Sequence, residues 1–264
     1  MYRNLATANL RAIGRGRRLI VLLTATVCIV ALGGAWALHR SHGTSDPSKL
    51  ARLRSAAPPG MVLIPAGEFL VGSDDADADD DVRPRHRENL PDYYIDVHEV
   101  TNREFQKFDP TRAFPADEAD MPANSINYAQ AEAYARSVGK RIPTDREWEK
   151  AARGTDGRRY PWGDRWDPKR VAPRRKRPGE KSPAPVRMKG MLCAIGPSRL
   201  QNVGSVPSGD SPYGCKDMAG NAWEWVQGFY NDNPQMRILR GGAVGYGERA
   251  CRTYIRSIEG EADT

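Results

Sequence analysis

The sequence predicts an α+β protein with much irregular structure, preceded by one membrane-spanning helix. Short stretches with helix-capping signals alternate with short stretches rich in β-branched and aromatic residues, and 25 Gly and 20 Pro are spread over 264 residues. Glycine and proline favour turns, so the elements must be short and joined by long connections. The third observation is a run of residues, 19–38, that carries no charge at all.

Residues 19–38 form the predicted membrane helix. About 20 apolar residues, rising ~1.5 Å each, span a bilayer core of about 30 Å. Arg11, Arg15, Arg17 and Arg18 precede the run, and positive charge stays on the cytoplasmic side. We therefore predict a basic cytoplasmic segment, 1–18, and a single-pass protein of the inner or plasma membrane. The rest is extracytoplasmic, in the periplasm if the cell is Gram-negative.

Two other interpretations of the N-terminus stay open. Ala35-Trp36-Ala37 has the form of a signal-peptide cleavage site, and Arg17-Arg18 resembles a twin-arginine signal. The apolar run exceeds the ~7–15 residues of a usual signal sequence, which favours an uncleaved anchor. All three interpretations place the rest of the chain outside the cytoplasm.

The net charge of +7 belongs mainly to the N-terminal segment. Nine of the 40 Lys/Arg and one of the 33 Asp/Glu precede Ser55, which leaves 31 bases and 32 acids after it. A near-neutral globular part attracts a phosphate backbone weakly. We therefore predict no nucleic-acid partner.

The extracytoplasmic part is divided at Gly60. Residues 39–59 are polar and proline-containing, as in a linker, and residues 60–264 form the predicted domain. Residues 61–72 alternate apolar positions around Pro65-Ala66-Gly67, which predicts a β-hairpin, and residues 92–100 are typical of a strand.

Two helices are predicted from capping boxes, in which a hydroxyl caps the first turn and a glutamate three residues later reaches back. The pairs are Thr101 with Glu104 and Thr144 with Glu147. A third segment is amphipathic and ends at a glycine. The three predicted helices cover residues 102–108, 128–138 and 145–153.

Two charged segments read most simply as surface loops. Residues 74–81 contain six Asp, but they lack the glycine turn and terminal Glu of an EF-hand, which favours a solvated loop over a calcium loop. Residues 168–190 are basic and proline-rich. A mobile surface loop is favoured there over a patch for an acidic partner.

The first chemical cluster is residues 217–225, where Asp217 and Glu224 flank a tight turn at Gly220. Side-chain and carbonyl oxygens on such a turn suit calcium, which takes 6–8 oxygen ligands. The alternative is a purely structural turn, fixed by two core tryptophans, with Glu224 capping backbone amides.

The second cluster is residues 240–252, a glycine-rich segment that contains Cys251. Arg249 and Arg252 flank this thiol and would lower its pKa, which makes a cysteine nucleophilic. The alternative, which residue chemistry alone favours, is a buried structural thiol. Cys193, Cys215 and Cys251 are an odd number beyond the membrane helix, so one disulfide and one free thiol is allowed, with no pairing assigned.

Collinear motifs over about residues 60–258 resemble the sulfatase-modifying-factor family, that is, the formylglycine-generating-enzyme domain. They read MVLIPAGEFLVGS, YYIDVHEVTNREF, AEAYARSVGKRIPTDREWEKAARG, YPWGD, SPYGCKDMAGNAWEWV, RILRGG and CRTYIR. The resemblance implies a loop-rich variant of the C-type-lectin-like fold. It also implies oxidation of a client sulfatase's cysteine to formylglycine with O2 and a copper ion held by two thiolates.

Carried over residue by residue, the resemblance implies a calcium site. Asp217 and Glu224 would bind through their side chains, and Gly220 and Ala222 through their carbonyls. A second calcium site of the family falls on residues 171–173, where Val-Ala-Pro offers no suitable side chain.

The family's active site is matched only in part. Cys251 matches its second cysteine and Trp223 its tryptophan, whereas Tyr246 stands at the first cysteine and Ala243 at the serine. Soft Cu(I) prefers thiolate ligands, and one thiolate with a phenol is a poor substitute for two. The implied catalytic set is therefore Cys251, Tyr246 and Trp223, with copper binding in doubt.

Two hypotheses of function follow. The first is a membrane-anchored oxidoreductase of the formylglycine-generating type, acting on a sulfatase-like client. The second is a catalytically degenerate binding or maturation module for an extracytoplasmic protein or glycan. The family's final Gly-Phe-Arg strand is not found in this sequence, so we expect either a replaced strand or an open sheet edge.

Overall fold

The computed structural model describes residues 46–173, 185–188, 191–194 and 200–260. The chain divides into two units, residues 1–46 and 47–264, and the fold below is that of the second. The predicted cytoplasmic segment and membrane helix, residues 1–38, lie outside the described residues. Within the described ranges, no helix has the length and apolarity needed to cross a membrane.

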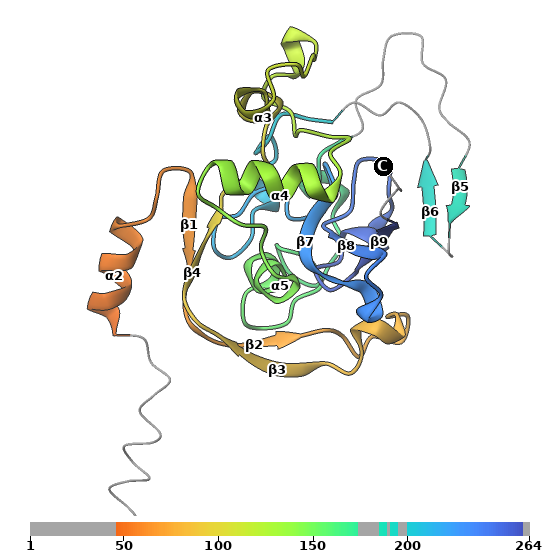
Figure 1. Cartoon of the computed structure of the whole chain (residues 1–264). Helices are drawn as coiled ribbons and strands as arrows, with labels where there is room; N and C mark the ends of the chain where they lie inside the picture. Colours follow the sequence, from red (N-terminus) through yellow and green to blue (C-terminus); the bar gives the residue numbers. More distant parts are fainter. Residues whose placement is uncertain (1–45, 174–184, 189–190, 195–199, 261–264) are drawn as a thin grey trace, which may run out of the picture. The chain divides into compact units, whose positions relative to one another are not determined.

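Helix α5 (Asp145–Arg153) lies at the centre of the fold, between the strands (Figure 1). It begins at the predicted capping box, because the Thr144 hydroxyl accepts from the Glu147 N–H and Glu147 accepts from the Thr144 N–H. Trp148 is completely buried. It packs in the main core with apolar side chains from three strands and a loop, among them Ile64, Val226, Ile238 and Met218.

The other two predicted helices are confirmed as α3 (Asn102–Phe108) and α4 (Tyr128–Ser137). Helix α3 starts at the predicted capping box of Thr101 and Glu104. Helix α4 starts at a capping box that we did not predict, formed by Asn127 and Gln130. The two helices meet where the Phe105 and Tyr134 rings stack 5.4 Å apart.

The predicted hairpin over residues 61–72 is wrong. Strand β1 (Met61–Ile64) pairs with β4 (Tyr93–Asp96), and β2 (Gly67–Val71) pairs with β3 (His86–Leu90), all antiparallel. A two-residue hairpin turn usually needs positive φ at its first central position. Pro65 would occupy that position, and its ring fixes φ near −65°. The two strands therefore enter different sheets.

A three-stranded antiparallel sheet lies beside α5, in the order β7 (Glu224–Phe229), β8 (Met236–Arg240), β9 (Ser257–Gly260). Strand β9 pairs with the edge of β8, so the open edge considered above is not found there. Strands β5 (Pro185–Met188) and β6 (Met191–Ala194) form a separate antiparallel pair. Part of residues 168–190 is thus a strand rather than a loop.

The predicted linker, residues 39–59, contains helix α2 (Pro47–Ser55). The Tyr94 hydroxyl donates to the Leu53 carbonyl at 2.8 Å, and Lys49 pairs with Asp92 at 3.3 Å. Leu50 and Leu53, three residues apart on one helix face, are half-buried. These contacts hold the helix on the domain.

The acidic loop, residues 74–81, forms ion pairs with arginines and is not a freely solvated loop. Asp75, Asp77 and Asp79 pair with Arg159, Arg252 and Arg249 at 2.7, 2.8 and 2.6 Å. Hydrogen bonds from the Arg159 and Tyr254 side chains lower the pKa of Asp75 despite the opposing effect of its burial. The loop therefore has a structural role, since its acids hold residues 249–254 in place, and it is not a calcium loop.

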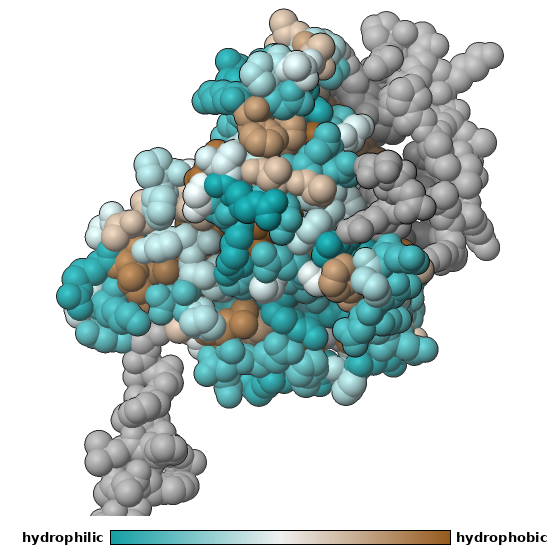
Figure 2. Space-filling model, in the orientation of Figure 1, coloured by the Kyte–Doolittle hydropathy of each residue, from teal (hydrophilic) through white to brown (hydrophobic). Residues whose placement is uncertain are grey.

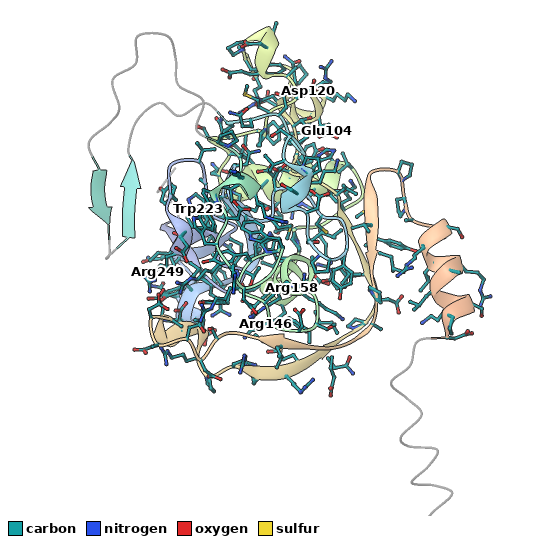
Figure 3. All side chains as sticks on the ribbon, turned by 180° about the vertical axis from the view of Figure 1, so that it is seen from behind. Glu104, Asp120, Arg146, Arg158, Trp223 and Arg249 are labelled. Atoms are coloured by element: carbon teal, nitrogen blue, oxygen red, sulfur yellow. The ribbon has the colours of Figure 1, made fainter. Side chains whose placement is uncertain are left out.

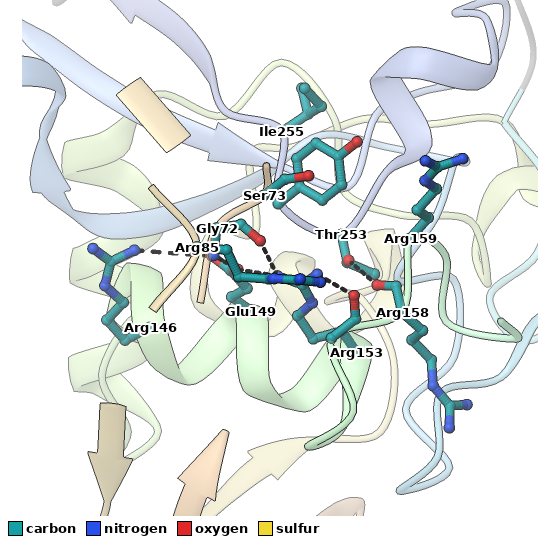
Figure 4. A network of polar contacts seen from close by, with 12 residues as sticks. Gly72, Ser73, Arg85, Arg146, Glu149, Arg153, Arg158, Arg159, Thr253 and Ile255 are labelled. Carbon is teal, nitrogen blue, oxygen red and sulfur yellow. Dashed lines mark hydrogen bonds and ion pairs between the residues drawn. The ribbon is translucent and has the colours of Figure 1, made fainter. Parts of the chain in front are cut away.

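Beneath this loop lies a buried ion network, the Arg240 cluster: Asp145, Glu149, Arg153, Arg240 and Arg256. Arg240 is completely buried and contacts Asp145 at 2.5 Å and Glu149 at 3.0 Å. Arg153 donates to the Gly72 carbonyl and to Glu149 (Figure 4). Every carboxylate in this cluster has an arginine partner.

Candidate functional site

The turn before β7 is held in an unusual backbone conformation. Asp217, Gly220 and Asn221 all have positive φ, at 55°, 87° and 61°. The completely buried Asn221 side chain fixes the turn, because it accepts from the Gln201 N–H at 3.0 Å and donates to Glu99 at 2.9 Å. The predicted cluster of residues 217–225 is therefore rigidly placed.

Three acidic side chains gather at this turn, and we call them the Glu99 cluster: Glu99, Asp217 and Glu224. Glu99 accepts from the Asn221 side chain and from the Ala222 N–H at 3.0 Å, and Asp217 accepts from the Gly204 N–H. Within the described ranges, none of the three forms an ion pair. Sequence reasoning missed Glu99, because it lies 122 residues from its partner Asn221.

Burial raises the pKa of each acid in the Glu99 cluster. For Glu99 the pKa lies well above its ordinary value, because of desolvation and then repulsion by Asp217 and Glu224. Burial raises the pKa of Glu224 to about 8. Desolvation also raises the pKa of Asp217. The cluster therefore resists holding three negative charges unless a cation joins it.

One oxygen in the Glu99 cluster has no partner. Glu224 Oε1 and the Trp148 indole N–H are both buried and lie near each other without forming a hydrogen bond of good geometry, although the indole N–H partly offsets the effect of burial on the pKa of Glu224. A Cβ built on Gly241 would lie 3.6 Å from this oxygen and 3.8 Å from the Ala222 carbonyl oxygen. Two acceptor oxygens thus lie near Gly241, beside a Trp148 ring carbon at 3.4 Å, and oxygen is the ligand atom that a hard cation prefers.

The four residues predicted to bind calcium lie together on this one turn. Among the described side chains, no group of three or more His, Cys, Asp and Glu is arranged to hold a metal ion. As the resemblance implies, a calcium ion here would take two carboxylates, Asp217 and Glu224, and the carbonyls of Gly220 and Ala222. All four donors are oxygens, the ligand atom that calcium prefers, so the residues present suit such an ion in their chemistry.

The structure brings two of the three predicted catalytic residues into contact. The rings of Trp223 and Tyr246 meet edge to face, with centroids 5.4 Å apart. The Val244 N–H donates to the Asn221 carbonyl, which ties the Tyr246 segment to the turn that carries Trp223. Both aromatic side chains are half-buried, and Trp223 lies on the same side of the molecule as Arg249 (Figure 3).

Cys251, the third predicted catalytic residue, is a buried free thiol. It is 2% exposed, and burial raises its pKa to about 12. The interpretation as a buried structural thiol is confirmed, and Arg249 and Arg252 do not activate the thiol, because their guanidinium groups pair with Asp79 and Asp77 instead. Cys215 is also free and buried, so these two cysteines form no disulfide.

A glycine allows the segment of Cys251 to pack closely against the strand entry. Gly242 has φ 80°, and a Cβ there would lie 2.9 Å from the Ala250 carbonyl oxygen and 3.3 Å from the Cys251 nitrogen. Only a residue without a side chain permits this approach. The thiol is therefore held under the backbone rather than presented at the surface.

These residues do not fit a copper ion held by two thiolates. Tyr246 offers a phenol, Ala243 offers no ligand, and the one thiol at this place, Cys251, is 2% exposed. Soft copper requires deprotonated sulfur. The observed chemistry of the site is instead an aromatic pair beside a turn rich in carboxylates.

Three curated relatives resemble the chain. An uncharacterized Bacillus subtilis protein, YfmG, is 32% identical over 205 residues, 64% of this chain and 41% of that protein. The inactive C-alpha-formylglycine-generating enzyme 2 of Mus musculus is 28% identical over 243 residues, 72% of this chain and 76% of that protein. The formylglycine-generating enzyme of Bos taurus is 27% identical over 255 residues, which is 76% of this chain and 66% of that protein.

A solved structure supports the fold. PvdO from Pseudomonas aeruginosa superimposes with a TM-score of 0.59 at 21% identity, covering 77% of this chain and 89% of that one. Residues 47–263 match the family described as the sulfatase-modifying factor enzyme 1-like domain. The family that the motifs resemble is thus confirmed, and this chain belongs to the sulfatase-modifying factor family.

Proposed function

We propose that this chain binds an extracytoplasmic client polypeptide at its Trp223–Tyr246 surface and does not oxidise it through copper. The observation that carries the proposal is the state of Cys251, a single buried thiol whose pKa is raised to about 12. A copper oxidase of the resembled type needs two thiolates at this place, and Tyr246 occupies the other position.

Two further findings support a binding role. The Trp223–Tyr246 pair is half-buried, and aromatic side chains with one accessible side are common anchors at protein interfaces. The mouse relative described above is named as inactive. Its likeness makes loss of oxidase activity within this family a reasonable precedent.

The second candidate function is oxidation of a client cysteine through Cys251. It is favoured by one observation, the presence of Trp223 and Cys251 at the positions that match the family's active site. This candidate requires that the Cys251 segment open to expose the thiol, because the described structure keeps it buried.

Calcium is the cofactor that we propose for either function. Asp217 and Glu224, with the carbonyls of Gly220 and Ala222, would hold it. Such an ion would neutralise the Glu99 cluster and so stiffen the turn that carries Trp223. We also propose that residues 19–38 anchor the chain in the membrane and place the domain outside the cytoplasm, where a sulfatase-like client would be met.

The test separates binding from oxidation. The full-length chain is loaded with Cu(I), and O2 uptake is measured with a cysteine-containing peptide from a sulfatase-like protein. We expect no uptake above a copper-only blank. Uptake that disappears in Cys251→Ser would contradict the proposal and establish the second candidate.

The binding surface is tested with the same peptide carrying a fluorescent label. We expect Tyr246→Ala to weaken binding at least tenfold in fluorescence anisotropy. Phe108→Ala serves as the control, since Phe108 is 38% exposed on α3. Equal binding by wild type and Tyr246→Ala would remove the aromatic pair from the interface.

A further inference from the structure

Helix α2 presents a basic face on the outside of the domain. Its sequence, PSKLARLRS, contains bases but no acid, and Lys49, Arg52 and Arg54 are all exposed. Within the described ranges, Arg52 and Arg54 form no ion pair. Lys49 pairs with Asp92 at 3.3 Å, yet its side chain is still 54% exposed. In Figure 2 the outer edge of α2, at the left of the view, is accordingly hydrophilic.

The apolar side chains of α2 are used within the domain. Leu50 and Leu53 are half-buried there, and the Tyr94 hydroxyl donates to the Leu53 carbonyl. A helix that inserts into a bilayer needs a free apolar face. Because the apolar face of α2 packs on its own domain, the helix can meet a membrane only through its charges, at the level of the lipid headgroups.

The length of the chain keeps α2 close to the proposed membrane anchor. Only residues 39–46 separate that anchor, residues 19–38, from Pro47 at the start of α2. Even when it is fully extended, a stretch of this length covers less than about 30 Å. The headgroups are therefore within reach of α2, an inference that rests on the membrane anchoring proposed above.

We propose that α2 lies against the anionic phospholipid headgroups of the leaflet that the domain faces. The lipid phosphates supply the negative charge that Arg52 and Arg54 do not meet within the domain. Each base near an anionic surface favours such a contact about fivefold. Arginine suits phosphate in particular, because its guanidinium donates to two oxygens at once. The contact is electrostatic, so it weakens as the salt concentration rises.

This contact sets the orientation of the candidate client surface. In Figure 3, Trp223 lies across the domain from the orange helix α2. With α2 on the headgroups, the surface formed by Trp223 and Tyr246 is therefore turned away from the bilayer. A client polypeptide in the extracytoplasmic space reaches this surface without displacing lipid.

The test uses the full-length chain in lipid nanodiscs. One set contains phosphatidylcholine alone, and the other contains phosphatidylcholine and phosphatidylglycerol in equal parts. Amide hydrogen exchange is followed by mass spectrometry in α2, with α3 as the internal reference, because a partner that binds the folded helix slows its exchange. We expect exchange in α2 to be at least fivefold slower in the anionic discs, and this difference to disappear at high salt. Equal exchange of α2 in the two sets would overturn the proposal.

A matched pair of double variants assigns the contact to α2. Arg52→Gln with Arg54→Gln removes the two unpaired charges and is expected to abolish the difference between the discs. Arg103→Gln with Arg136→Gln removes the same charge from α3 and α4, where these side chains are 60% and 65% exposed, and is expected to keep the difference. Loss of the difference in both would indicate a general attraction of the domain and would overturn the proposal.

The same experiment separates this proposal from the anchoring on which it rests. A full-length chain that does not enter the discs would contradict the anchoring and, with it, the contact of α2. A chain that enters them but shows no lipid-dependent exchange in α2 would contradict the contact alone.

Discussion

The Arg240 cluster and the Glu99 cluster bury carboxylates in the same domain but treat them in opposite ways. In the Arg240 cluster, Asp145 and Glu149 meet a completely buried guanidinium at 2.5 and 3.0 Å. In the Glu99 cluster, Glu99 accepts from neutral N–H groups, no acid forms an ion pair among the described residues, and Glu224 Oε1 has no hydrogen bond of good geometry. The pKa of Asp145 is accordingly lowered by its arginines in spite of burial, whereas that of Glu224 is raised by burial.

The difference separates a structural cluster from a candidate site. Buried carboxylates that are paired need no other partner, and removing the arginine leaves them uncompensated. Buried carboxylates without a cation destabilise the fold when ionised, and such strongly shifted groups gather at functional sites. We therefore assign the Arg240 cluster to stability and propose that the Glu99 cluster binds a cation.

The largest expected effect is on the Arg240 cluster, in which each carboxylate is paired with an arginine. Arg240→Met removes the guanidinium and leaves Asp145 and Glu149 without their shared partner. We expect the free energy of unfolding to fall by about 3–5 kcal/mol in urea titrations. Arg103→Met is the control, since its pair with Asp120 is exposed, and it should cost less than about 1 kcal/mol. A loss as small for Arg240→Met as for the control would mean that the cluster is not structural.

The next largest effect is on the Glu99 cluster, where we expect the free energy of unfolding to depend on pH. The folded pKa of Glu224 is raised to about 8, so between pH ~4.5 and ~8 the folded state binds more protons than the unfolded state. Stability therefore falls as pH rises through this window, by on the order of 1–3 kcal/mol in EGTA. Glu224→Gln should flatten the slope in urea titrations at each pH. A wild-type slope that the variant keeps would assign the proton to another group.

The contribution of the Arg240 cluster to stability depends on pH with the opposite sign. The pKa of Asp145 is lowered by Arg240 and Arg256, which outweigh its burial. Its contribution is complete above the ordinary Asp pKa of about 3.9 and is lost as pH falls below it. Acid unfolding should thus depend on the Arg240 cluster, and the loss of stability toward pH 8 should depend on the Glu99 cluster.

The smallest effect belongs to the acidic loop, which pairs its acids at the surface. Asp77 is 60% exposed where it meets Arg252. Asp77→Asn should cost about 0.2–1 kcal/mol, and less at high salt. Thermal melts at two salt concentrations measure the loss of stability and its dependence on salt. A salt-independent cost of several kcal/mol would show that the loop belongs with the buried network.

Local signals in the sequence predicted the local structure well. Helices α3 and α5 begin at their predicted capping boxes and end within the predicted residues, because a cap involves only neighbours along the chain. Strand pairing was not predictable in the same way. Strands β1 and β2 are adjacent in sequence yet join different sheets, and the register depends on partners 15 to 35 residues away.

Only the part of the candidate site that lies within one short segment of the sequence was predictable. Asp217, Gly220, Ala222 and Glu224 fall on one turn and were found from their spacing and the family resemblance. Glu99 joins them from far along the chain, and the arginines beside Cys251 turn toward the acidic loop instead of the thiol. No local pattern encodes those choices, since they follow from how distant segments pack.

Calcium titration of the full-length chain tests most directly the claim that the Glu99 cluster holds a cation. We predict one calcium site by calorimetry, weakened at least tenfold in Glu224→Gln and unchanged in Asp77→Asn, whose acid already has an arginine. Calcium binding that Glu224→Gln leaves intact, or no binding at millimolar calcium, would contradict the claim.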